Sequence, residues 1–160
     1  MDKQAKRRAI LVFMQDRPGV LNKISGLIRR KMYNVDSLTV CSTLRQGISR
    51  MTITMRENNP EKITQVIRQI EKIPEVINAK ELDREKSYWR EVAIIKLETT
   101  QAVLDNLKRE FYFELLDHPK TETFIIQIAG TSIFINAFID DIGSENIIEI
   151  ARTGVTSMVK

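Results

Sequence analysis

The sequence is poor in the residues from which disulfide frameworks and His/Cys metal sites are built. Its 160 residues include one cysteine, Cys41, and one histidine, His118. A lone cysteine excludes an intramolecular disulfide, and these two residues cannot form a His/Cys metal cluster. No apolar run is long enough to span a bilayer, and the first ten residues lack the apolar segment of a secretory signal. We therefore expect a cytoplasmic protein without a metal ion.

The composition is that of an ordinary globular protein. Hydrophobic residues make up 42% of the chain and charged residues 29%, with a formal net charge of +4. Much of the positive charge lies near the N-terminus, at residues 3–8, and in the run 29–31. A nucleic-acid-binding protein would join such a cluster to a groove-reading helix or to exposed aromatic residues. Neither pattern is present, so we interpret the first cluster as a solvated segment.

The first half of the chain alternates between strand and helix patterns. Apolar residues at helical spacing begin at Val20 and again after Pro60, and Pro74 ends the second run. Together these patterns predict a β-α-β-β-α-β order over residues 8–83. That order favours a ferredoxin-like two-layer α/β (α+β) sandwich, with both helices on one face of a four-stranded antiparallel sheet. The predicted strands are residues 8–15, 34–43, 48–56 and 75–82.

A charged joint, "DREKSYWRE", separates this unit from a second one, which we place at residues 88–160. The same β-α-β-β-α-β order is predicted there. Thr99 or Thr100 precedes the first helix, while Thr131 or Ser132 can cap the second, which ends before Gly143. The predicted strands are residues 91–98, 111–117, 121–130 and 146–151.

No constellation of catalytic side chains is visible. Asp140 and Asp141 fall on the expected solvent face of a helix, and His118 precedes a proline in an expected turn. Cys41 lies in a predicted strand, where we expect a small thiol facing the core. We therefore do not expect the isolated chain to be an enzyme.

One turn could bind an anion. In "QDRPGVLNKI", residues 15–24, Pro18 suits a first helical position and Gly19 allows close approach to the backbone. Free amides at the start of a helix attract a carboxylate. From these residues alone, a purely structural turn between strand and helix is the alternative interpretation.

Four stretches together resemble the small, regulatory subunit family of acetolactate synthase, also called acetohydroxyacid synthase. They occupy residues 16–40, 49–53, 126–139 and 149–154, and include "YNVDSLTV", "SRMTI" and "ARTG". The first stretch also resembles ACT domains in general. The resemblance implies an N-terminal ACT domain and a non-catalytic subunit that activates a separate large subunit, makes it sensitive to valine or other branched-chain amino acids, and serves isoleucine, valine and leucine biosynthesis.

The resemblance also implies which components belong to which chain. Thiamine diphosphate, Mg and FAD would belong to the large catalytic subunit, which condenses pyruvate with pyruvate or 2-ketobutyrate, and this chain would hold no cofactor. The ACT domains would pair in a homodimer with an effector between the two chains. The implied effector-binding residues are Asp16, Pro18, Gly19, Val20 and Leu21 of one chain, with Asn34 and Val35 of its partner.

Two residues depart from the family pattern. Asp16 stands where the family often has Asn, and Met32 where a Gly usually precedes Tyr33. Three other functions remain as alternatives: an ACT-domain sensor regulating a different enzyme, an enzyme in its own right, and an amino-acid-responsive transcription regulator. The last would need a helix-turn-helix segment, for which the two sandwiches leave no room.

Overall fold

The computed structural model describes residues 5–117 and 122–160, which divide into two compact units. The first unit ends at Tyr88 but also includes Gly154–Lys160, and the second is Trp89–Thr153. We predicted a second unit at residues 88–160. In the structure the segment 154–160, the end of that predicted unit, packs on the first unit.

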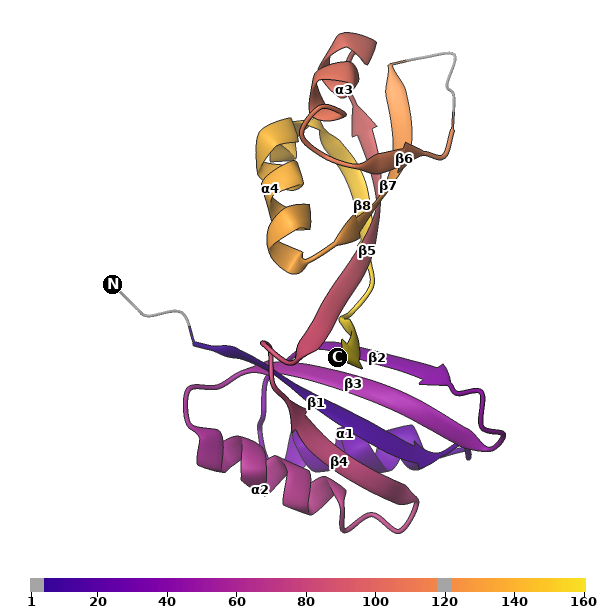
Figure 1. Ribbon diagram of the computed structural model, residues 1–160, viewed down its shortest axis with the longest axis vertical. Coiled ribbons are helices and arrows are strands. Elements are labelled where there is room, and N and C mark those ends of the chain that lie inside the picture. Colours follow the sequence, from indigo (N-terminus) through magenta and orange to yellow (C-terminus); the bar gives the residue numbers. More distant parts are fainter. Residues whose placement is uncertain (1–4, 118–121) are drawn as a thin grey trace. The chain divides into compact units, whose positions relative to one another are not determined.

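The first unit has the predicted ferredoxin-like topology (Figure 1). Its antiparallel sheet has the strand order β2-β3-β1-β4. The central position of β1 explains its nearly continuous apolar sequence. Both of its edges are paired with neighbouring strands, and both of its faces are covered. The elements are β1 (Arg7–Gln15), α1 (Val20–Arg30), β2 (Val35–Ser42), β3 (Ile48–Arg56), α2 (Pro60–Ile70) and β4 (Val76–Leu82).

Both helices of this unit cover one face of the sheet through the apolar stripes seen in the sequence. The α1 helix buries Val20, Ile24, Leu27 and Ile28 against Ile10, Val12, Met51 and Ile53 of the strands. At the start of α2, the Asn59 side chain accepts a hydrogen bond from the Glu61 amide at 2.8 Å. The core lies between the helices and this face.

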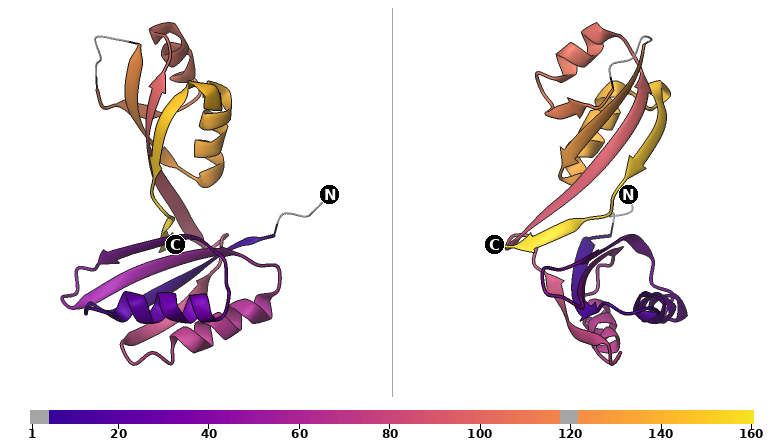
Figure 2. Two further views of the ribbon diagram at one scale, coloured as in Figure 1. Left: turned by 180° about the vertical axis from the view of Figure 1, so that it is seen from behind. Right: turned by 90° about the vertical axis from the view of Figure 1, so that its right-hand side faces the viewer.

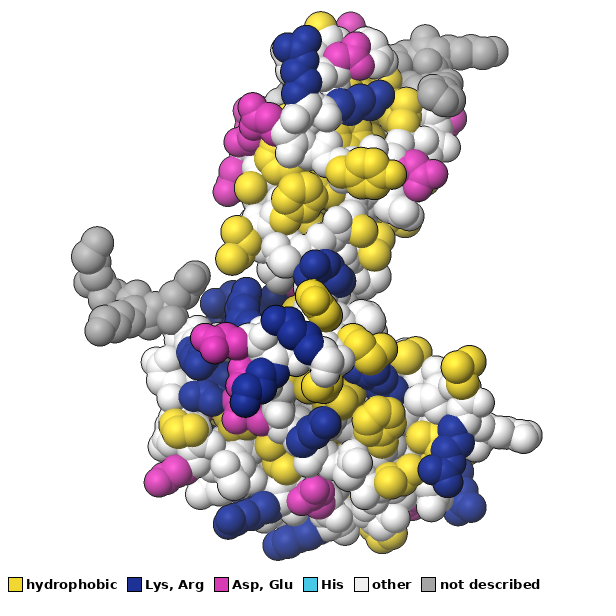
Figure 3. Space-filling model, viewed as in Figure 1, with side chains coloured by type: hydrophobic (Ala, Val, Ile, Leu, Met, Phe, Trp, Pro, Cys, Tyr) yellow, Lys and Arg dark blue, Asp and Glu magenta, His cyan; other side chains and the backbone are white. Residues whose placement is uncertain are grey.

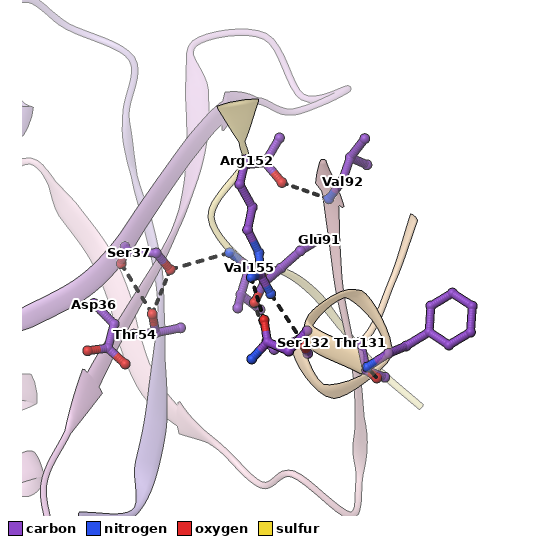
Figure 4. A network of polar contacts seen from close by, with 12 residues as sticks. Asp36, Ser37, Thr54, Glu91, Val92, Thr131, Ser132, Arg152 and Val155 are labelled. Carbon is purple, nitrogen blue, oxygen red and sulfur yellow. Dashed lines mark hydrogen bonds and ion pairs between the residues drawn. The ribbon is translucent and has the colours of Figure 1, made fainter. Parts of the chain in front are cut away.

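The opposite face of the sheet is partly covered by residues 154–160. Leu11 is only 3% exposed on this face, and its register partner Thr52 approaches Ser157 with 3.3 Å between their hydroxyl oxygens. Figure 4 shows the Val155 amide donating to the Ser37 hydroxyl, at 3.4 Å. Residues 154–160 therefore cover part of the sheet face that the two helices leave open.

The second unit repeats the topology, with the strand order β6-β7-β5-β8. Its predicted helix starts are confirmed at Thr100 and Thr131, whose side chains accept from the amides of Val103 and Phe134. The elements are β5 (Ser87–Glu98), α3 (Gln101–Leu107), β6 (Phe113–Leu115), β7 (Thr123–Gly130), α4 (Ser132–Ile142), a 3-10 turn η1 (Ser144–Asn146) and β8 (Ile147–Arg152). The final strand, β9 (Thr156–Val159), pairs with β5.

A buried carboxylate organises one end of the second unit. Glu91 is 4% exposed, and its Oε2 accepts a hydrogen bond from Nε of Arg152 at 2.6 Å. Its other oxygen accepts from the Ser132 hydroxyl (Figure 4). Arg152 Nη1 donates to the Asn136 side chain at 2.7 Å. Arg152 of the "ARTG" stretch thus links β8 to the first turn of α4.

Candidate functional site

The turn between β1 and α1 presents the N-terminus of a helix to solvent. Gly19 is the N-cap of α1 with φ 86° and ψ −14°, a left-handed conformation that favours glycine. The helix begins two residues later than predicted: Pro18 lies in the preceding turn, and the first helical residue is Val20. Beside Gly19 the space is open, because a Cβ placed there would meet no atom within 4 Å.

Two amides of the first helical turn are available to a ligand. The first four N–H groups of any α-helix lack partners within the helix. Here the Val20 amide donates to Arg17 O at 3.4 Å and the Lys23 amide to Gly19 O at 3.0 Å. Within residues 5–117 and 122–160, the amides of Leu21 and Asn22 make no comparable bond. Together with the positive end of the helix dipole, they can hold a carboxylate.

The predicted site residues fall into two groups. Asp16, Pro18, Gly19, Val20 and Leu21 lie together at the start of α1, whereas Asn34 and Val35 follow its end. The helix has 11 residues, so about 16 Å separates its two ends. Figure 2 shows α1 along its length in the left-hand view. A single chain therefore does not bring the two groups together.

Side-chain burial differs between two of the predicted residues. Val20 is 2% exposed, and its side chain packs in the core of the first unit. Val20 is the first residue of the apolar stripe of α1, so its side chain points toward the sheet. Leu21, by contrast, is 42% exposed and is the apolar side chain that the turn presents to solvent.

The second group lies beside an unusual helix end. Met32 has φ 56°, the one positive φ among the described non-glycine residues. Its amide donates to Arg29 O at 3.0 Å and the Tyr33 amide to Ile28 O at 3.3 Å, the two bonds of a Schellman motif. This motif demands a left-handed residue, which explains why glycine suits position 32. It directs the chain from α1 into Asn34, which lines a hollow of about 410 Å³.

The first group is held in place by contacts at its base. The Asp16 amide donates to Gly47 O and the Gln15 amide to Glu75 O, both at 2.8 Å. The carboxylate of Glu75 forms an ion pair with Lys23 of α1. The hydrogen bond from Lys23 is the main cause that lowers the pKa of Glu75 below its ordinary value. The turn is thus fixed while its amides stay open.

The catalytic candidates gain no support. His118 lies outside the described residues. Cys41 is exposed, so the prediction of a core-facing thiol is wrong: β2 is an edge strand, and Cys41 pairs with Arg50 on the face opposite the helices. Asp140 and Asp141 are exposed, as predicted. In the described part of the chain, no cluster of acidic, His and Cys side chains could hold a metal ion, and no helix is long and apolar enough to cross a membrane.

Comparisons with known sequences match both units. A family model described as "AHAS small subunit-like ACT domain" matches residues 10–78, and one described as "Small subunit of acetolactate synthase" matches residues 90–160. A protein of Archaeoglobus fulgidus named "Probable acetolactate synthase small subunit" is 35% identical, over 96% of this chain and 97% of that protein. The acetolactate synthase small subunit of Mycolicibacterium smegmatis is 33% identical, over 92% and 87%.

The fold has a similarly close counterpart among solved structures. The crystal structure of the acetolactate synthase small subunit from Thermotoga maritima matches with a TM-score of 0.89 and 28% identity. The match covers 97% of this chain and 98% of that one.

Proposed function

The chain belongs to the family of acetolactate synthase small subunits, and from this membership we propose that it is a non-catalytic regulatory subunit. It activates a separate, thiamine-diphosphate-dependent large subunit and transmits feedback inhibition by valine. The observation that carries the regulatory part is the open helix N-terminus at Gly19. Its free amides suit the binding of a small carboxylate.

The effector site needs two chains. We infer that the Gly19 turn of one protomer faces Asn34 and Val35 of its partner in a homodimer formed through the ACT domains. The separation of these groups at opposite ends of α1 supports this arrangement, because only a second chain can supply the missing half. Sedimentation at micromolar concentration tests it, and a monomer of 18.5 kDa would remove the site.

The chemistry of the turn matches an α-amino acid with an apolar side chain. The Leu21 and Asn22 amides can receive the carboxylate, and the Asp16 carboxylate can accept hydrogen bonds from the ammonium group. The exposed Leu21 side chain offers an apolar contact that suits a branched aliphatic group. Valine meets all three requirements.

Thiamine diphosphate, Mg and FAD are assigned in this proposal to the large subunit, which carries out the condensation of pyruvate. This chain binds none of them. Its contribution is to bind the large subunit and to change the activity of that subunit according to whether the effector is bound.

Reconstitution with the cognate large subunit tests the proposal. Acetolactate formation is measured for the large subunit alone, for this chain alone, and for the mixture with and without valine. We expect no synthesis by this chain, stimulation in the mixture, and loss of that stimulation with valine. Valine binding by calorimetry without stimulation would instead identify an ACT-domain sensor of another enzyme, and turnover by this chain alone would identify an enzyme.

A further inference from the structure

A second surface of the first unit has the properties of a docking site. It is a hollow of about 480 Å³ on the sheet face opposite the helices, beyond the part that residues 154–160 cover. Its apolar walls include Phe13, Leu44, Ile48 and Ile77, and two arginines, Arg45 and Arg50, border it. Figure 3 shows apolar and basic side chains next to one another on this unit.

Two of these apolar side chains are unusually accessible. Leu44 lies in the turn between β2 and β3 and is fully exposed, and Ile77 of β4 is 53% exposed. Elsewhere on the same face Leu11 is only 3% exposed. Apolar side chains that gather at one exposed place mark an interaction surface, because burying them in a complex is favourable.

The charges around the hollow are of one sign. Within the described residues, neither Arg45 nor Arg50 forms an ion pair with a carboxylate. Arg50 lies 5.8 Å from the centre of the Phe13 ring and donates to Ser157 O, contacts that leave its charge unbalanced. A guanidinium group that has no carboxylate partner favours binding of an acidic side chain. The complementary partner therefore carries an acidic side chain beside an apolar one.

The turn that carries Leu44 is closed by hydrogen bonds and is connected to the candidate effector site. The Thr43 hydroxyl donates to Ile48 O at 2.9 Å and accepts from the Arg45 amide at 3.2 Å. On the other side of the turn, Gly47 O accepts from the Asp16 amide at 2.8 Å. The backbone that carries Leu44 and Arg45 is therefore hydrogen-bonded before any partner binds, which reduces the entropy lost on docking.

We propose that this hollow docks a segment of the large subunit in which an apolar side chain lies next to Asp or Glu. The apolar side chain packs between Leu44 and Ile77, and the carboxylate pairs with Arg45. This inference rests on the proposed function, which supplies the large subunit as partner. It adds the surface used and the chemistry of the segment bound there.

Exposed-residue variants test the proposal with little risk to folding. The variants are Leu44→Ser, Ile77→Ser and Arg45→Glu, with Val103→Ser and Arg109→Glu as matched exposed controls in the second unit. The full chain is titrated into the cognate large subunit, and the concentration giving half-maximal stimulation of acetolactate formation is measured. We expect this concentration to rise roughly tenfold for each variant, the effect of losing one interfacial anchor, and to stay within about twofold for the controls.

The outcomes separate the inference from the proposed function. Saturable stimulation by the unaltered chain, with the three variants equal to the controls, overturns the docking surface and leaves the regulatory function intact. No stimulation by the unaltered chain overturns the function, and the inference with it. Variants that sediment as a smaller species than the unaltered chain would identify the hollow as an interface between copies of this chain and overturn the inference. Circular dichroism confirms that each variant is folded.

Discussion

The main-chain amide of Val155 donates a hydrogen bond to the hydroxyl of Ser37, 3.4 Å away and 118 positions earlier in the chain. That hydroxyl also lies 2.6 Å from Oγ1 of Thr54 on the next strand. The residues that lead out of the second unit are therefore anchored to β2, the strand that begins with the candidate effector residue Val35. The first unit is complete only when these residues are in place.

Replacing Gly19 with Asp separates the effector site from a purely structural turn. An Asp carboxylate would lie where the effector carboxylate binds, so we expect the valine concentration for half-inhibition to rise at least about tenfold. Gly19→Asn is the matched control, since Asn tolerates the left-handed conformation equally well without the charge. Equal loss of inhibition in both variants would point to distortion of the turn, and undiminished inhibition in Gly19→Asp would refute the site.

Replacing Met32 with Gly should stabilise the first unit. The left-handed conformation costs a residue with a Cβ about 1–2 kcal/mol, and the greater freedom of glycine in the unfolded chain offsets about 0.4–1 kcal/mol of the gain. We expect a net increase of about 0.5–1 kcal/mol in the free energy of unfolding, measured by circular dichroism in urea. Met32→Ala keeps the Cβ and should gain nothing, and a similar gain there would contradict the conformational explanation.

Replacing Gly154 with Ala should weaken the attachment of the tail. The new Cβ would lie 2.4 Å from Thr39 Oγ1 and 3.1 Å from Ser37 Cβ, closer than packed atoms allow. Overpacking of this kind costs about 1–3 kcal/mol of stability, which urea unfolding measures. The exposed neighbouring change Thr156→Ala serves as control. Adding Thr39→Ala removes the nearest collision and should restore part of the loss; no restoration would count against the steric cause.

Replacing Glu91 with Gln should destabilise the second unit. It removes the charge that pairs with Arg152 at 2.6 Å in a largely buried setting. Because the Arg152 side chain is partly exposed, we expect a loss of about 2–3 kcal/mol, somewhat below that of a fully buried pair. Urea unfolding followed by Trp89 fluorescence measures it. Glu98→Gln, in the same strand but exposed, should behave as the unaltered chain does.

The Lys23–Glu75 ion pair predicts a pH dependence of stability. The pKa of Glu75 is lowered in the folded chain, so the pair contributes stability above the ordinary pKa of about 4.5, and this contribution disappears as the pH falls through the lowered value. The stability difference between the unaltered chain and Glu75→Gln should therefore be present at pH 6 and shrink toward pH 3. A difference that is constant across this range would show that ionisation is not its source.

Local patterns in the sequence were sufficient to predict both sandwiches, because stripes such as Ile24, Leu27 and Ile28 report which side of a helix is buried. The helix cap at Thr131 could also be predicted from neighbouring residues. The exposure of Cys41 could not, since it depends on which strand lies at the sheet edge. The attachment of residues 154–160 to the first unit was also unpredicted, because a short strand carries no signal for a partner more than a hundred residues away.

The tail at residues 154–160 has a consequence for the order in which the molecule is made. A ribosome adds these residues only after the entire second unit, at about 5–20 residues per second. For several seconds the strands of the first unit are therefore complete in sequence while Thr52 still lacks its contact with Ser157. During that interval one face of a nascent sheet stays open to water, and to whatever else can bind it, until its own chain returns to cover it.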